Sequence, residues 1–194
     1  MDNLQPISSL YAQLVAGTSA LRAGQVIAYP TEAVFGLGCD PDSLPAVAQL
    51  LSYKQRLVTQ GLILVAADYS QLQPYIDEDR LPEAAKQRLL ASWPGPINWV
   101  VPASINTPGW LTGRFNSLAV RVSAHPLVHQ LCQTFGKPVT STSANIIGKP
   151  PCRTAAAVRA QWGDQLFILS GEVGGERNPC EIRDAMTNDC LRPS

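Results

Sequence analysis

Apolar residues recur at helical spacing in several stretches of the chain and, together with start and stop signals, predict helices. The first stretch places Leu10, Leu14 and Leu21 on one face and is followed by Gly24, which is a plausible end signal. Another opens at His125-Pro126, where proline takes a favoured first position. The expected helices cover residues 8–22, 43–53, 82–92, 126–135 and 154–162.

Shorter apolar runs lie between these helices and predict strands. Residues 31–41 are expected to form a loop after the first strand. Because strands and helices alternate, we expect an α/β fold in which flanking helices pack on a twisted, open, mixed sheet. Nothing in the composition marks a linker, so residues 1–194 are expected to form a single domain. The expected strands cover residues 26–29, 61–67, 97–102, 118–122, 139–142 and 166–169.

Composition narrows the class of protein. The chain is 45% hydrophobic and 15% charged, which is typical of a globular domain. Its 15 basic and 15 acidic residues cancel, so any contact with RNA would have to come from a local patch. The N-terminus lacks a signal-peptide pattern, and the longest apolar run, residues 62–67, is too short to cross a membrane. We therefore expect a soluble, cytoplasmic protein.

The metal-binding and redox signals are weak. The five cysteines are widely and irregularly spaced without a CxxC pair, which argues against a disulfide framework and a zinc site and fits a reducing cytoplasm. His125 and His129 are four residues apart and could place two ligands on one helical face. Pro126 puts His125 at the helix start instead, and the chain has no third histidine, so a role at the helix entry or surface is favoured.

Two polar segments suggest a binding site, although the chain has no P-loop, GxGxxG or nucleophile-elbow motif. Ser141, Ser143 and Asn145 share one face if the chain is extended there. Such groups at strand ends can bind a phosphate or carboxylate, although they are also common turn formers. Thr31 follows the first strand in a segment whose glycines, Gly36 and Gly38, permit positive φ or close backbone approach.

Three cations are placed where an anion could bind. Arg121 is the only charge on its face of the strand at 118–122. If buried it must meet an acidic partner or line a cleft that binds an anion; the alternative is an edge strand facing solvent. Lys54 and Arg56 would point the same way in an extended segment and could clamp a polyphosphate, or they could simply end a solvated helix.

Several segments, in order and without large insertions, resemble the YrdC-like family and its short bacterial form in particular. The resemblance covers nearly the whole chain. The matching segments are YPTEAVFGLGCDP (29–41), KQR (54–56), GLILVAA (61–67), WPGP (93–96), WLTGRF (110–115), SLAVRV (117–122), STSAN (141–145), PPCRT (150–154), GG (174–175) and EIRDA (181–185).

The resemblance implies a YrdC-like fold with a deep concave cleft and the activity of an L-threonylcarbamoyladenylate synthase. Such an enzyme makes threonylcarbamoyl-AMP and pyrophosphate from L-threonine, bicarbonate or CO2, and ATP with Mg²⁺, and the family implies no protein-bound metal. Partners of the TsaD, TsaB and TsaE type would then pass the group to an adenosine of tRNAs that read codons beginning with A, with possible weak binding of tRNA. Carried over by matching positions, the threonine-binding role falls on Thr31, Arg121 and Ser141. The ATP-binding role falls on Lys54, Arg56, Ser117, Ser143, Asn145 and Cys180.

Three positions depart from the family pattern: Asn98 replaces a common threonine, Leu57 a common proline, and Cys180 a serine that contacts the nucleotide. Cysteine is a weaker hydrogen-bond donor than serine, which puts the contact of Cys180 in question. No residue is singled out as a catalytic base, and the reaction requires no covalent nucleophile. The main rival interpretation is a non-catalytic factor that binds structured RNA through local arginines in tRNA or ribosome maturation. A carbamoyl-transfer or maturation enzyme is a second, lower-ranked rival.

Overall fold

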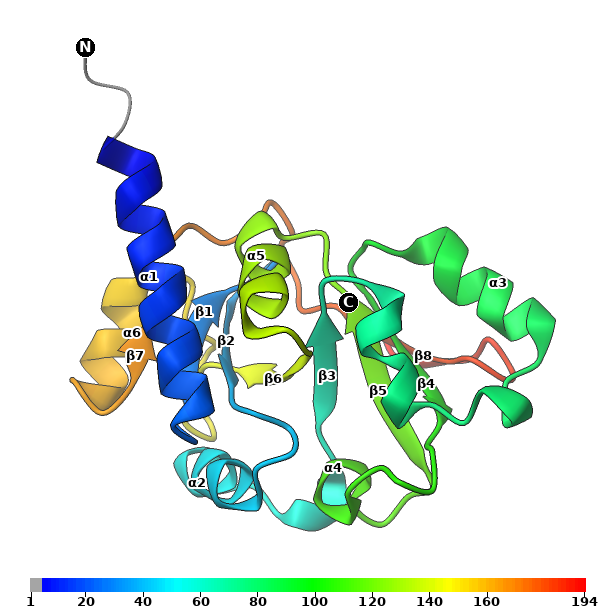
Figure 1. Ribbon diagram of the computed structural model, residues 1–194. Coiled ribbons are helices and arrows are strands. Elements are labelled where there is room, and N and C mark those ends of the chain that lie inside the picture. Colours follow the sequence, from blue (N-terminus) through cyan, green and yellow to red (C-terminus); the bar gives the residue numbers. More distant parts are fainter. Residues whose placement is uncertain (1–4) are drawn as a thin grey trace.

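A nine-stranded mixed sheet is the centre of the computed structural model, which describes residues 5–194 (Figure 1). The strand order is β7-β1-β2-β6-β3-β5-β4-β8-β9. Pairs β1–β7, β3–β5 and β4–β8 are parallel and the others are antiparallel. The strands are β1 (Ile27–Pro30), β2 (Phe35–Gly38), β3 (Ile63–Ala66), β4 (Ile97–Pro102), β5 (Ser117–Val122), β6 (Val139–Ser143), β7 (Phe167–Ile168), β8 (Glu181–Asp184) and β9 (Cys190–Arg192).

The five predicted helices all occur, α4 was not predicted, and several helix ends have identifiable causes. The Ser43 hydroxyl accepts from the N–H of Ala46, and the Thr154 hydroxyl accepts from that of Ala157, so each caps a helix start. Pro126 opens α5 as predicted, and Gly136 ends it in the left-handed conformation. The helices are α1 (Gln5–Arg22), α2 (Leu44–Lys54), α3 (Glu83–Ser92), α4 (Gly109–Thr112), α5 (Pro126–Phe135) and α6 (Ala155–Trp162), with short 3₁₀ turns at 58–60, 69–71, 73–75 and 78–80.

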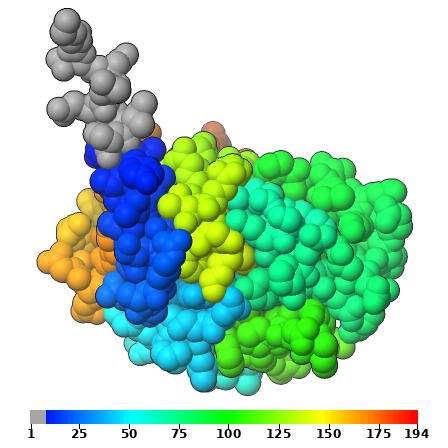
Figure 2. Space-filling model, viewed as in Figure 1, coloured from blue at the N-terminus to red at the C-terminus, as the bar shows by residue number. Residues whose placement is uncertain are grey.

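The two faces of the sheet are covered differently. Leu64 and Val120 pair across β3 and β5 and belong to the larger apolar core, which includes residues of α2, α3 and α6. Val65 lies on the opposite face, in a smaller core with residues of α1 and α5. These two helices pack side by side, as Figure 2 shows. They cover only part of the second face, and the remainder forms the floor of the cavity described below.

The expected loop at 31–41 is wrong in one part, because β2 lies within it. This strand has no alternating pattern, and it forms by pairing with β1 on one side and β6 on the other. A Cβ added at Gly38 would lie 2.2 Å from the carbonyl oxygen of Thr140, so the glycine is needed for close approach rather than for positive φ. Strands β8 and β9 were not predicted either, because they are short, contain no fully buried residue and form by adding to the edge of β4.

No helix among residues 5–194 is long and apolar enough to span a bilayer.

Candidate functional site

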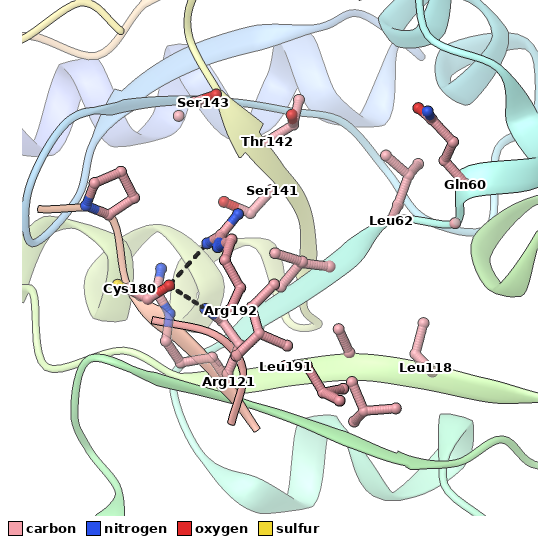
Figure 3. Close-up of a pocket in the computed structure, with 18 of the residues that line it drawn as sticks. Gln60, Leu62, Leu118, Arg121, Ser141, Thr142, Ser143, Cys180, Leu191 and Arg192 are labelled. Atoms are coloured by element: carbon pink, nitrogen blue, oxygen red, sulfur yellow. Dashed lines mark hydrogen bonds between the residues drawn. The ribbon is translucent and has the colours of Figure 1, made fainter. Parts of the chain in front are cut away.

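A cavity of about 520 Å³ opens over β3, β4, β5 and β6, on the part of the second face that α1 and α5 do not cover (Figure 3). The register explains its floor, because Ile63 pairs with both Ala119 and Ser141, and Val100 also pairs with Ala119. Walls come from the segment after β1, the segment after α2, the end of α4, and strands β8 and β9. Among the lining residues are Thr31, Arg56, Leu62, Asn98, Leu111, Phe115, Ser117, Arg121, Ser141, Ser143, Cys180, Asp184, Leu191 and Arg192.

Arg121 lies at one end of this cavity and is 3% exposed. Its Nη1 is 3.0 Å from Oε2 of Glu32, which is also buried. Strand β5 lies between β3 and β4, so the alternative of an edge strand facing solvent is wrong. The predicted acidic partner and the predicted cleft both occur at this arginine.

Glu32 is fixed by more than Arg121. Its Oε1 accepts hydrogen bonds from the hydroxyl of Ser123 at 2.6 Å and from the backbone N–H of Ala124 at 3.2 Å. Ser123 also accepts from the N–H of His125. The carboxylate therefore connects the segment after β1 to the turn between β5 and α5.

Thr31 and Ser141 line the same cavity and are almost entirely buried. The Thr31 hydroxyl donates to the carbonyl oxygen of Val34 at 2.7 Å. Gly174 donates its N–H to the carbonyl oxygen of Thr31, and a Cβ there would lie 2.7 Å from the carbonyl oxygen of Glu32. The predicted threonine-binding residues thus share one cavity, and the Gly174-Gly175 segment packs against the loop that carries Thr31.

Lys54 and Arg56 do not point the same way, because Gln55 takes the left-handed conformation that ends α2. The ammonium of Lys54 donates to the carbonyl oxygens of Ser143 and Asn145 at 2.6 and 2.8 Å, and to Oδ1 of Asn145 at 2.8 Å. Burial lowers the pKa of Lys54 to about 8, and the nearby charge of Arg56 adds to the effect. Lys54 therefore supports the turn after β6 and is not part of the cavity wall.

Arg56 reaches the cavity and donates to the carbonyl oxygen of Gly61 at 2.9 Å. Arg192 reaches it from β9 and donates to the carbonyl oxygen of Cys180 at 2.7 Å, which places it beside the residue that also contacts Arg121 (Figure 3). Partial burial lowers the pKa of Arg56, and the charge of Arg192 lowers it further. Neither arginine forms an ion pair within the part of the chain that the structure describes.

The serines and the asparagine predicted to bind ATP fall into two groups. Ser117 and Ser143 line the cavity. Asn145 does not, because its side chain is used within the turn: Oδ1 accepts from the Ser143 hydroxyl at 2.7 Å, and Nδ2 donates to the carbonyl oxygen of Lys149 at 2.9 Å. The sequence pattern placed Ser141, Ser143 and Asn145 on one face, but only Ser141 and Ser143 line the cavity.

Cys180 is buried in the cavity wall, and its Sγ contacts Nη1 of Arg121. Burial raises the pKa of the thiol. The side chain thus lies beside the arginine assigned to threonine, and its backbone carbonyl contacts Arg192. Asn98 donates to the carbonyl oxygen of Glu181 at 3.0 Å, which holds β8 against β4.

Four residues in or behind the cavity wall were missed. Glu32 is the one acid in the buried segment between β1 and β2, and that isolation was a usable signal. Asp184 lies in β8 and Arg192 in β9, two short strands that carry no periodic pattern. Phe115 lies just before β5, and nothing local marks it as a wall residue.

The position of His125 is explained by the start of helix α5. His125 is the N-cap residue of α5, and it is buried rather than at the surface, with Nε2 3.0 Å from the carbonyl oxygen of Glu172. No group of three or more His, Cys, Asp or Glu side chains within residues 5–194 is arranged to hold a metal ion.

Comparison with known families gives one match along most of the chain. The sequence profile of the family Sua5_yciO_yrdC, described as Telomere recombination, matches residues 19–194.

Two curated relatives carry the same name, threonylcarbamoyl-AMP synthase. The protein from Photorhabdus laumondii is 60% identical over 174 residues, which cover 90% of this chain and 92% of the relative. The protein from Enterobacter sp. strain 638 is 56% identical over 192 residues, which cover 99% of each.

Among solved structures, P. abyssi Sua5 complexed with L-threonine has the same fold, with a TM-score of 0.84 and 30% identity. The match covers 95% of this chain but 54% of Sua5, so the chain spans about half the length of that protein.

Proposed function

The chain belongs to the Sua5/YciO/YrdC family, and on that basis we propose that it is a threonylcarbamoyl-AMP synthase, a nucleotidyltransferase that uses L-threonine, bicarbonate or CO2, and ATP. The observation that carries the proposal is a single cavity with two different cationic ends. Arg121, paired with a carboxylate, lies at one end, and Arg56, which donates to Gly61 and has no carboxylate partner within the described residues, lies at the other. Arg192, also without a carboxylate partner there, lies next to Cys180. The Arg121 end suits the carboxylate of an amino acid, and the Arg56 end suits a polyphosphate.

At the Arg121 end, Thr31 and Ser141 provide polar groups close to the arginine. We assign the threonine-binding role to these three residues, and the neighbouring Sua5 structure bound to L-threonine supports it. A pocket that hydrogen-bonds the substrate hydroxyl would reject amino acids lacking that group, because its own polar atoms would be left unpaired.

At the other end, Arg56, Ser117 and Ser143 are placed to contact ATP directly. Lys54 and Asn145 would contribute indirectly, because they fix the turn that carries Ser143. We retain Cys180 as a nucleotide contact beside Arg121 and Arg192, since it touches both arginines.

The proposed reaction joins two anions. The threonine nitrogen attacks the carbon of CO2 and loses a proton, giving a carbamate. A carbamate oxygen then attacks the α-phosphorus, and the bond from that phosphorus to the bridging oxygen breaks to release pyrophosphate. Positioning and neutralisation of charge are therefore the main requirements, and Arg121 and Arg56 supply both without a covalent nucleophile.

Mg²⁺ is expected to enter with ATP rather than in a protein cage. Asp184 is the one acidic side chain among the residues that line the cavity, and its Oδ1 already accepts two backbone N–H bonds. A single carboxylate is not a cage for Mg²⁺, whereas phosphate oxygens are ligands that Mg²⁺ commonly takes. When bound, the ion would neutralise phosphate charge.

The wider setting follows from the proposed product. Threonylcarbamoyl-AMP would be consumed by proteins of the TsaD, TsaB and TsaE type acting on tRNA, and we propose a cytoplasmic reaction with no more than weak tRNA binding by this chain. A non-catalytic RNA-binding role is not favoured, because the curated relatives carry the name of an enzyme.

The direct test is to measure pyrophosphate release by the purified protein with ATP, L-threonine, bicarbonate and Mg²⁺. Release should require threonine and should fall when Mg²⁺ is replaced by a chelator. L-2-aminobutyrate, which lacks the hydroxyl, is the matched control and should be a poor substrate. Release that does not depend on threonine, or no release at all, would refute the proposal.

A further inference from the structure

The Arg121 guanidinium is held by one of its terminal nitrogens. Nη1 takes both the ion pair with Glu32 at 3.0 Å and the contact with Cys180. Nε is buried and has no hydrogen-bond partner, and Nη2 donates to nothing within the described residues. Nε–H and Nη2 lie on the same edge of the planar group, which is one of the edges that binds a carboxylate through two parallel hydrogen bonds. The protein thus occupies one part of the guanidinium and leaves a bidentate edge without a partner.

Glu32 is anchored well enough to impose that orientation. Its Oε1 accepts from Ser123 and Ala124 at the entry to α5, while its backbone carbonyl accepts from the N–H of Glu176. Both Glu32 and Arg121 are more than nine-tenths buried. Arg121 lines the cavity, whereas Glu32 does not, so Glu32 could influence a ligand in the cavity through the arginine that it holds.

We propose that Glu32 is a positioning residue for the amino-acid substrate: it fixes Arg121 by Nη1 and so presents the Nε–Nη2 edge to the substrate carboxylate. The inference rests on the proposed function and extends it to a residue outside the cavity wall. It also assigns Ser123 a role, because its hydroxyl fixes the carboxylate that fixes the arginine.

A positioning role and a purely electrostatic role for Glu32 predict opposite changes in carboxylate binding when Glu32 is removed. If Glu32 acted only through its negative charge, its removal would make the cavity more positive and would tighten the binding of an anionic group. If it acts by orientation, its removal releases the guanidinium and weakens binding of the carboxylate, although the positive charge remains. The sign of the change therefore separates the two roles.

The test is Glu32→Gln, which keeps the size of the side chain and removes its charge. We expect the KM for L-threonine to rise about tenfold or more while the KM for ATP changes less than about twofold. Ser123→Ala should raise the KM for threonine less, about threefold, and it carries the test if Glu32→Gln does not fold. The matched control is Glu78→Gln, because Glu78 forms an ion pair with Lys86 and a hydrogen bond with Tyr69 away from the cavity.

A double variant adds a second readout. If Glu32 works through Arg121, Glu32→Gln should have little further effect on threonine kcat/KM once Arg121 is already Ala. An unchanged or lower KM for threonine in an active Glu32→Gln protein would overturn the inference, as would equal rises in both KM values. An inactive wild-type protein would instead refute the proposed function, so the two failures are distinguishable.

Discussion

The two ends of the cavity hold their arginines in different ways. Arg121 is buried and paired with Glu32, whereas Arg56 is partly buried and Arg192 is exposed, and these two donate only to backbone carbonyl oxygens. A buried guanidinium without a carboxylate would be very costly, while a partly solvated one is not. Burial, rather than residue type, therefore decides where the protein itself must supply the counter-charge of an arginine.

This difference also fits the charges of the proposed substrates. The Arg121–Glu32 pair is neutral overall, so that end of the cavity offers oriented hydrogen bonds to a zwitterionic amino acid. Arg56 and Arg192 remain uncompensated by protein carboxylates within residues 5–194, so both can attract the charges of a polyphosphate. Variants of Arg121 and of Arg56 test this difference in turn.

The largest effect is expected for Arg121→Ala. Threonine-dependent kcat/KM should fall by at least about a hundredfold, because the group that binds the carboxylate is gone. The free energy of unfolding should also fall by about 3–5 kcal/mol, because Glu32 is left buried without its partner. Steady-state kinetics and urea unfolding measure the two effects.

The control for this stability loss is the double variant Arg121→Ala/Glu32→Gln. Removing the stranded charge should recover part of the lost stability but none of the activity. An Arg121→Ala protein as stable as the wild type would contradict the interpretation that Arg121 and Glu32 form a buried pair in which each needs the other.

A smaller effect at the other end is expected for Arg56→Ala. The KM for ATP should rise about ten- to a hundredfold, which is what loss of one or two charge-assisted hydrogen bonds would produce. Stability should change little, because Arg56 has no buried carboxylate to strand. Arg80→Ala is the control, since Arg80 is exposed and lies away from the cavity. A rise in the KM for threonine alone would show that the two ends have been assigned the wrong way round.

The smallest effect concerns Lys54, which is buried like Arg121 but is held by neutral oxygens and Asn145. Its pKa of about 8 lies below its usual value, so between about pH 8 and pH 10.5 the unfolded chain binds more protons at this residue than the folded protein does. Its contribution to stability should therefore rise with pH across that window, by no more than about 1.4 kcal/mol per pH unit.

The measurement is the difference in free energy of unfolding between the wild type and Lys54→Met at several pH values. Comparing the two proteins cancels the titration of other groups, such as the buried tyrosines. A difference that falls or stays level from pH 8 to pH 10 would show that Lys54 is not desolvated as the structure indicates.

The helices and most strands could be predicted from the sequence because their signals are local. Apolar spacing, the caps at Ser43 and Thr154, and Pro126 all act within a few residues of the helix ends that they define. Strand β2 could not be predicted in this way, because its residues pair with β1 and with a strand about a hundred residues away. The edge strands β8 and β9 depend likewise on the place that β4 offers them.

The amino-acid sequence was enough for the α/β class and the resemblance to the family, and it showed that Arg121, if buried, would need an anionic partner. Only the tertiary structure decided that the partner is Glu32, that Arg192 joins Arg56, and that Lys54 and Asn145 stand behind the cavity wall. The two kinds of feature differ in how far along the chain the underlying interactions act. Helix and strand preferences act over a few residues, whereas the 3.0 Å approach of Glu32 to Arg121 exists only after the sheet has brought distant segments together.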